Sequence, residues 1–329
     1  MQLKTPQFWS ERNTIALALM PFSVIYFLVS SLRKFFQKPY KISKPVICVG
    51  NLIAGGSGKT PVAIALGKML REIAPPDYEF SYLSTGYMGD GAKFVALRDG
   101  KHLAKNVGDE PMLLVKTAPT FVAKERLFGA QQIDNISKIK AIILDDGMQN
   151  NSLYKDLVIL VVDGKIAFGN EWLIPAGPMR ETLSGGLKKA HFVVVVGEMT
   201  ANLQQKLAGK KIVRSHLIVN NLEEFRNEKL FAFCGLAYPQ KFFSLLKSSD
   251  LEVCEEKSFP DHYSYQDSDL EILYEDAQKK GLKLITTKKD WVKFSKEFQE
   301  KISYLDIELE FLDKEFVKQE LQKIINYEC

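Results

Sequence analysis

The stretch that most constrains the fold of this chain is the glycine-rich segment 53–60, with the sequence IAGGSGKT. An apolar run at residues 45–49 precedes it and predicts a buried strand, and residues 61–70 follow it with the apolar spacing of a helix. Strand, glycine-rich loop and helix in this order are the setting of a phosphate-binding loop. The alternative is an ordinary glycine-rich turn between a strand and a helix. We predict an α/β fold with a parallel sheet that binds a nucleotide at this loop.

The residues of this loop have distinct expected roles. Its glycines let backbone N–H groups converge on phosphate oxygens, and the helix that follows adds its positive end. We expect Lys59 to reach the β- and γ-phosphates and Thr60 to offer its hydroxyl to Mg²⁺. The strict pattern begins with Gly at the position where this chain has Ile53. The predicted nucleotide-binding residues are Ile53, Ala54, Gly55, Gly56, Ser57, Gly58, Lys59 and Thr60.

Length and composition describe a globular protein. The 329 residues are enough for two domains, and a hydrophobic content of 46% with 26% charged residues is typical of a packed core. A net charge of +4 is too small to predict a nucleic-acid partner, and we expect none. The four cysteines are scattered without a CxxC pair. This pattern predicts a reduced, cytosolic body without structural zinc.

The N-terminal segment 1–44 is apolar and then basic. Residues 14–32 carry no charge and are nearly as long as the ~20 residues that cross a bilayer. No small-residue cleavage site follows them, which disfavours a signal peptide. Pro21 leaves a full span and a kinked, half-inserted helix both open, and a buried amphipathic helix packed on the domain is a third alternative. We predict attachment to an anionic membrane surface, with the body cytoplasmic, because five basic residues follow the run: Arg33, Lys34, Lys38, Lys41 and Lys44.

Acidic residues stand at two places suited to a nucleotide site. Asp109 opens an apolar helical segment and is followed by Glu110 and Pro111, which is ordinary helix-capping chemistry. A capping carboxylate at the mouth of such a site can also meet a substrate hydroxyl. Asp145 and Asp146 end a predicted buried strand, where a Walker B carboxylate holds Mg²⁺. The alternative for this pair is a solvated turn, but paired carboxylates repel each other and a bound cation relieves that repulsion.

A loop rich in glycine and proline, residues 169–181, carries Glu171 and Arg180. The guanidinium of Arg180 suits a phosphate, although pairing with Glu181 or Glu171 is the alternative. Strands alternating with helices recur after residue 229, which predicts a second α/β unit and a cleft at the carboxyl ends of the strands. The predicted domains are a membrane-associated helix at 1–44, a nucleotide-binding domain at 45–199, a connecting ribbon at 200–228 and a smaller α/β domain at 229–329.

Six short motifs stand along the chain: GNL at 50–52, GDEP at 108–111, DDGMQ at 145–149, PAGPMR at 175–180, FPDH at 259–262 and TKKD at 287–290. In these motifs and their order, and over nearly its whole length, the chain resembles the tetraacyldisaccharide 4′-kinase family, the lipid A 4′-kinases of Gram-negative bacteria. Together the motifs are far more specific than the phosphate loop alone. The N-terminal apolar helix is of the family's kind, and Ile53 looks like a family trait.

The resemblance implies ATP-dependent phosphorylation of the 4′-hydroxyl of a tetraacyl glucosamine disaccharide 1-phosphate, giving lipid IVA. It implies ATP and Mg²⁺ as cofactors and the cytoplasmic face of the inner membrane as the location, with no obligate protein partner. The acyl chains would stay in the bilayer while the sugar enters the cleft. The implied site comprises Lys59 on the phosphates, Thr60 with Asp145 or Asp146 on Mg²⁺, Glu171 near the metal, Asp109 as proton acceptor, His262 as its partner, and Arg180 with Lys288 or Lys289 on substrate phosphate.

Two positions depart from the family pattern, and two other function classes compete with the kinase. Thr85, in the segment STGY at 84–87, stands where the family has arginine, and Asn150 stands where it has histidine. A membrane-associated GTPase or ATPase switch is the first rival, because 287–290 fits a loose guanine-reading motif; however, none of the strand-end aspartates has the glycine three residues on that a GTPase needs. The second rival is a non-catalytic membrane scaffold.

Overall fold

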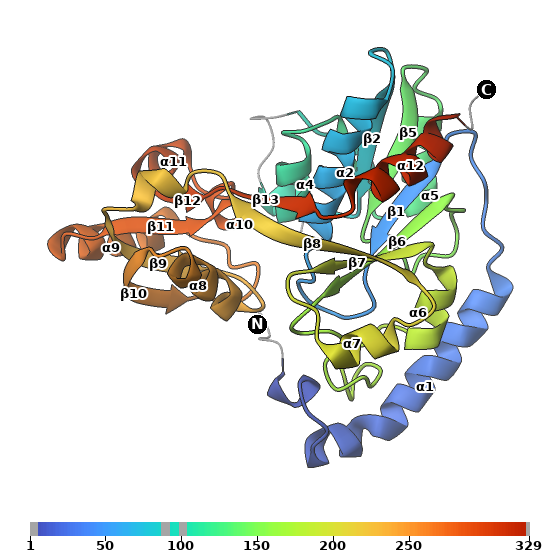
Figure 1. The fold of residues 1–329 in the computed structure, drawn as a ribbon, viewed down its shortest axis with the longest axis horizontal. Coiled ribbons are helices and arrows are strands. Elements are labelled where there is room, and N and C mark those ends of the chain that lie inside the picture. Colours follow the sequence, from blue (N-terminus) through green and yellow to red (C-terminus); the bar gives the residue numbers. More distant parts are fainter. Residues whose placement is uncertain (1–5, 87–92, 99–103, 327–329) are drawn as a thin grey trace.

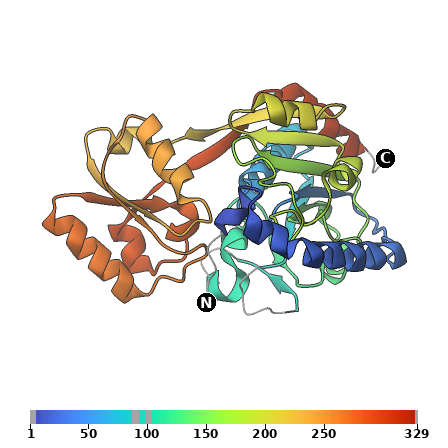
Figure 2. The same cartoon turned by 90° about the horizontal axis from the view of Figure 1, so that it is seen from below.

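The computed structural model describes residues 6–86, 93–98 and 104–326, which form two α/β units side by side and one long N-terminal helix (Figure 1). Seen from below, this helix lies along the outside of the larger unit (Figure 2). The predicted fold class, a parallel-sheet core with a second, smaller α/β unit and an N-terminal apolar helix, is confirmed.

The larger unit is built on a nine-stranded sheet in the order β13-β8-β7-β6-β1-β5-β2-β4-β3. Strands β3 and β13 pair antiparallel with their neighbours and the other pairs are parallel. The central strands are buried almost throughout, as their continuous apolar runs predict. Their bounds are β1 (Val46–Gly50), β2 (Glu79–Ser84), β3 (Val95–Ala96), β4 (Thr120–Val122), β5 (Ile139–Asp145), β6 (Leu157–Asp163), β7 (Phe192–Val196), β8 (Lys211–Val219) and β13 (Ile307–Phe311).

Helices cover both faces of this sheet. On one face, Val62 and Leu66 share a core cluster with Val317 and Leu321. On the other face, Ile133 and Leu203 belong to a second cluster. The first layer holds α2 (Lys59–Ile73), α12 (Lys314–Ile325) and α4 (Asp109–Leu114), with α3 (Ala104–Val107) before α4; the second holds α5 (Arg126–Asp134), α6 (Leu183–Lys189) and α7 (Ala201–Lys206).

The smaller unit has a parallel four-stranded sheet in the order β10-β9-β11-β12. Phe242 and Leu246 pack a helix on one face, while Leu270 and Phe298 pack two helices on the other. Its elements are β9 (Lys229–Cys234), α8 (Pro239–Ser248), β10 (Glu252–Ser258), α9 (Asp267–Lys279), β11 (Lys283–Thr287), α10 (Lys288–Trp291), α11 (Lys296–Lys301) and β12 (Ser303–Leu305); short 3₁₀ helices lie at η1 (Gln7–Trp9) and η2 (Leu222–Phe225).

The chain passes between the units twice, through two neighbouring strands. Strand β8 leads out of the large sheet and β13 returns antiparallel beside it, with Val219 opposite Ile307. The predicted ribbon at 200–228 therefore contains β8, a strand of the large sheet. The last strand and helix of the predicted domain at 229–329, β13 and α12, belong to the first unit. Composition misplaced these boundaries because β8 lies next to the sheet edge and exposes part of its side chains, so that it reads as polar.

The N-terminal helix α1 (Thr14–Phe36) continues through Pro21 and rests on the 169–181 loop. Ser23 donates a hydrogen bond of 2.7 Å to the Leu173 carbonyl, and Tyr26 donates one of 2.9 Å to the Arg180 carbonyl. The segment Thr14–Lys34 has a mean hydropathy of 2.1 and is long enough to cross a membrane. Only 11% of its most apolar window is buried against the rest of the protein. The alternative of a buried amphipathic helix therefore does not hold. The side chains exposed on α1 include Leu17, Phe22, Ile25, Leu28 and Leu32.

Candidate active site

The predicted phosphate-binding loop connects β1 to α2 at the carboxyl edge of the large sheet. Gly55 and Gly58 have φ angles of 113° and 87°, a region that favours glycine. The Asn51 side-chain amide donates a 2.8 Å hydrogen bond to the Ser57 hydroxyl and braces the loop from within. Lys59 is the first residue of α2 and its side chain is buried. The glycines thus stand where the backbone turns, and the helix begins at the predicted phosphate-binding lysine.

Ile53 occupies the position where the strict pattern has glycine, and its surroundings explain the difference. Its side chain is 2% exposed and packs in a core cluster of the large unit. Its backbone bridges to Met179, and the neighbouring Ala54 N–H donates a 2.8 Å bond to the Pro178 carbonyl. This part of the segment is paired like a strand, so an apolar side chain stabilises it better than glycine would.

Asp145 and Asp146 lie beside the loop but differ in environment. The Thr60 hydroxyl donates a 3.0 Å bond to Asp145, and Arg180 binds both oxygens of Asp146 at 2.9 and 3.0 Å. Burial raises the pKa of Asp145 to about 7, with the nearby Glu110 adding to it. Burial also acts on Asp146, but the charges of Lys59 and Arg180 outweigh it and hold the pKa of Asp146 below its usual range.

The oxygens at this edge fit a magnesium ion bound together with a nucleotide. The Asp145 Oδ1 atom is buried and has no hydrogen-bond partner among the described residues. A cation bound there would satisfy this oxygen and compensate the burial of the carboxylate. No three His, Cys, Asp or Glu side chains form a metal-holding group in the part of the chain that the structure describes. That is compatible with Mg²⁺, which usually takes one or two carboxylates and completes its shell with phosphates and water.

Two predicted site residues are engaged elsewhere. Glu171 forms ion pairs with Arg12, at 3.6 Å, and with Lys206. Lys288 pairs with Asp306 at 2.5 Å, beside the strand that returns to the large unit. These contacts support neither Glu171 as a metal ligand nor Lys288 as a contact for substrate phosphate.

Asp109 and His262 meet across the two units. His262 Nδ1 lies 2.9 Å from Asp109 Oδ2, and Lys289 Nζ lies 3.3 Å from His262 Nε2. The Asp109 carboxylate is an acceptor, so Nδ1–H of His262 donates to it, while Lys289 and Asp261 both lie near Nε2, with Asp261 Oδ2 at 3.8 Å. The N-cap of α4 is Gly108, so the Asp109 carboxylate is not used in capping and points to this contact instead.

One residue of this cluster, Lys293, was missed in the sequence. Its Nζ lies 3.2 Å from Asp109 and 2.9 Å from Asp290, and its side chain is 6% exposed. Burial would raise the pKa of Asp109, but the His262 hydrogen bond and the charges of Lys293 and Lys289 outweigh it and lower that pKa. A lysine three residues after an aspartate in a helical turn is the only local signal that could have indicated it.

Asp290 is not available for reading a guanine base, as the rival GTPase hypothesis requires. Its side chain is wholly buried and accepts hydrogen bonds from the Gly235 N–H at 2.8 Å and from the Thr287 hydroxyl at 2.9 Å. The segment 287–290 is thus a capped helix start inside the smaller unit.

The two departures from the family pattern have modest local consequences. Asn150 accepts hydrogen bonds from the backbone and hydroxyl of Ser152, at 3.2 and 2.9 Å, and so stabilises its own turn. Thr85 is partly buried after β2, and Tyr87 of the same motif lies outside the described residues.

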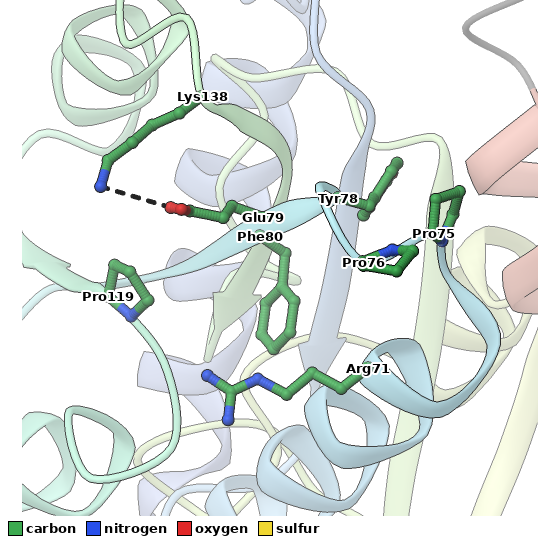
Figure 3. A pocket seen from close by; sticks show the side chains of 8 residues that line it. All are labelled: Arg71, Pro75, Pro76, Tyr78, Glu79, Phe80, Pro119 and Lys138. Carbon is green, nitrogen blue, oxygen red and sulfur yellow. Dashed lines mark ion pairs between the residues drawn. The ribbon is translucent and has the colours of Figure 1, made fainter.

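A hollow of about 550 Å³ lies at the opposite edge of the sheet (Figure 3). Glu79, the first residue of β2, lines it and pairs with Lys138 at 3.4 Å. The phosphate loop and Asp145 follow the carboxyl ends of their strands, whereas this hollow adjoins an amino end. In parallel sheets, ligands bind at the carboxyl ends, so the hollow is separate from the site described above.

Comparison with known proteins gives one family. The family model of tetraacyldisaccharide-1-P 4′-kinase matches residues 15–326. The tetraacyldisaccharide 4′-kinase of Rickettsia typhi is 36% identical over 326 residues, covering 98% of this chain and 99% of that protein. That of Rhodopseudomonas palustris is 36% identical over 88% of this chain and 85% of its own length. A solved structure of LpxK from Aquifex aeolicus in complex with ATP is similar, with a TM-score of 0.76 and 27% identity, covering 95% of this chain and all of that one. This chain therefore belongs to the tetraacyldisaccharide 4′-kinase family.

Proposed function

We propose that this chain transfers the γ-phosphoryl group of ATP to the 4′-hydroxyl of a tetraacyl glucosamine disaccharide 1-phosphate, the lipid A precursor, to give lipid IVA. The observation that carries the proposal is the family match from end to end, in a chain that pairs Asp109 with His262 next to a phosphate loop. Helix α4, which begins at Asp109, packs against α2 from that loop. This packing supports a proton acceptor close to the phosphoryl donor site.

Each residue of the proposed site would have a separate role in this reaction. The loop amides and Lys59 would hold the phosphates, and Arg180 would supply a second cation once a nucleotide competes with Asp146 for it. Asp109 would accept the proton of the sugar hydroxyl as that oxygen attacks, while the Nδ1–H of His262 keeps the carboxylate oriented. Thr60 and Asp145 would hold Mg²⁺, which when bound neutralises charge on the phosphates.

The test is phosphoryl transfer from γ-labelled ATP to the tetraacyl disaccharide 1-phosphate in detergent micelles. We expect label in the lipid, with GTP a poorer donor than ATP. Hydrolysis of GTP without any labelled lipid would support the switch instead, and absence of transfer from either nucleotide would contradict the proposal.

We also propose that α1 attaches the enzyme to the cytoplasmic face of the inner membrane. Ile25 and Leu28 are 58% and 60% exposed on this helix. Replacing both by glutamate is expected to abolish most binding to anionic vesicles, because two charges would have to enter the apolar boundary. Sedimentation with vesicles measures this. Ile272→Glu is the control, since Ile272 is equally exposed on α9 of the other unit and its variant should bind like the wild type.

The assignment of Thr60 to magnesium gives a second prediction. Thr60→Val keeps the shape of the side chain and removes the hydroxyl that bonds Asp145. We expect the magnesium concentration for half-maximal activity to rise about 10-fold or more, because loss of one oxygen weakens a metal site by at least that much. Thr117→Val is the matched control, because it makes the same substitution at a threonine whose hydroxyl donates to the Leu114 carbonyl, at 2.8 Å, and not to Asp145. An unchanged magnesium requirement in Thr60→Val would remove Thr60 from the metal site.

A further inference from the structure

Lys293 belongs to the smaller unit but contacts the proton acceptor of the larger one. It stands in the turn after α10, and its ammonium group lies 3.2 Å from Asp109 Oδ2. It also lies 3.2 Å from the Tyr263 carbonyl oxygen, to which it donates. With 6% of the side chain exposed, water replaces none of these partners easily. A lysine is seldom buried so far unless its charge is matched.

The partner that fixes Lys293 is Asp290. One oxygen of this carboxylate accepts from the Gly235 N–H and the Thr287 hydroxyl, and the other accepts from Lys293 at 2.9 Å. The Asp290 side chain is therefore held on both sides, and it directs the ammonium group toward Asp109. The chain of contacts runs from the smaller unit's backbone through two charged side chains to the carboxylate in the larger unit.

The balance of charge around Asp109 shows why a cation is needed there. Asp109 is 7% exposed, and a buried carboxylate loses its proton with difficulty unless positive charge is near. The groups that face it are His262, which is hydrogen-bonded to it, and the two lysines Lys293 and Lys289. Lys289 binds Asp261 at 3.6 Å, so Lys293 is the lysine in direct contact with Asp109.

We propose that Lys293, anchored by Asp290, is a positioning residue for phosphoryl transfer that reaches from the smaller unit and holds the Asp109 carboxylate in its reactive place. This inference rests on the proposed function. It assigns to the smaller unit a contribution beyond His262, namely the positive charge beside the acceptor. Lys293 does not touch the reacting atoms, and it acts through Asp109.

The test compares K293M with the wild type in the lipid kinase assay across pH. We expect kcat to fall about 10-fold or more while KM for ATP stays within about twofold, because the phosphate loop is untouched. Removing the cation raises the pKa of Asp109, so the acidic limb of kcat/KM should move to higher pH, by about 1 unit or more. A residue with a purely structural role would lower the melting temperature without moving this limb.

Two further variants keep the test decisive. K293R retains the charge, so its acidic limb should stay with that of the wild type, and this variant decides if K293M does not fold. K296M removes an exposed lysine from the following helix and should leave kcat and the limb unchanged. Wild-type kcat and limb in K293M, or an upward-shifted limb in K293R, overturns the role of Lys293. A wild-type enzyme that phosphorylates no lipid instead overturns the proposed function, so the two failures are distinguishable.

Discussion

Replacing Asp109 by asparagine is expected to lower kcat about 10²- to 10⁴-fold, the range for loss of a positioned proton acceptor. Asparagine has nearly the same size and keeps a hydrogen-bonding oxygen for Lys293 and His262, which lie 3.2 and 2.9 Å away. It cannot accept a proton from the attacking hydroxyl. The dissociation constant for ATP should stay within about twofold, because the phosphate loop is untouched.

The measurement for Asp109 pairs steady-state kinetics with ATP titration by calorimetry. Asp134→Asn is the control, since Asp134 lies at the end of α5 and binds Ser43 at 2.6 Å, away from the phosphate loop. Undiminished kcat in the Asp109 variant would mean that another group accepts the proton. Loss of ATP binding together with activity would mean that the substitution disturbs the nucleotide site, and the kinetic argument would not hold.

Replacing Lys59 by methionine is the second large effect. We expect kcat/KM to fall about 10²- to 10³-fold or more, because one donor that stabilises charge developing in the transition state is removed. Unlike the Asp109 variant, this one should also bind ATP more weakly, since the lysine contacts phosphates before and during the reaction. Asp146, at 3.8 Å from Lys59, keeps Arg180 as its partner, so the fold should survive the change.

Lys68→Met is the matched control for Lys59. Lys68 is on the same helix α2, but its side chain is 45% exposed and pairs with Glu308 on β13. An exposed ion pair contributes little to stability, so both activity and melting temperature should change little. If the Lys59 variant retained wild-type kcat/KM, the nucleotide would not bind at this loop.

The sequence was most informative where the chemistry is local. The phosphate loop, its strand and its helix lie within residues 45–73, and every feature that identifies them is a spacing of a few positions. The contact between Asp109 and His262 spans 153 residues, and family resemblance rather than spacing pointed to it. Lys293 was not predicted because its role depends on its contact with Asp109, which lies in the other unit. Glu171 was expected near the metal from the family resemblance, but nearby cations bind its carboxylate.

Domain boundaries were harder to derive because they depend on which strands pair. Composition distinguishes buried from half-exposed strands, and β8 resembles a linker by that measure. Nothing in the sequence of residues 307–311 indicates locally that they pair with β8, a strand some 90 residues earlier in the chain. The return of β13 and α12 to the large sheet is decided by packing, through Val317, Leu321 and Ile324 in the cluster beneath α2.

That return has a consequence for how the polypeptide matures during translation. Domains usually fold from the N-terminus as they leave the ribosome. Here the first unit lacks an edge strand and part of its apolar core until residues 307–325 emerge, whereas the second unit has all of its own strands by Leu305. The nascent first unit therefore stays incompletely folded, with the apolar surface of α2 uncovered, while the second unit, made later, can already be folded. Truncation shortly before residue 307 should consequently yield a soluble second unit attached to an aggregation-prone first one.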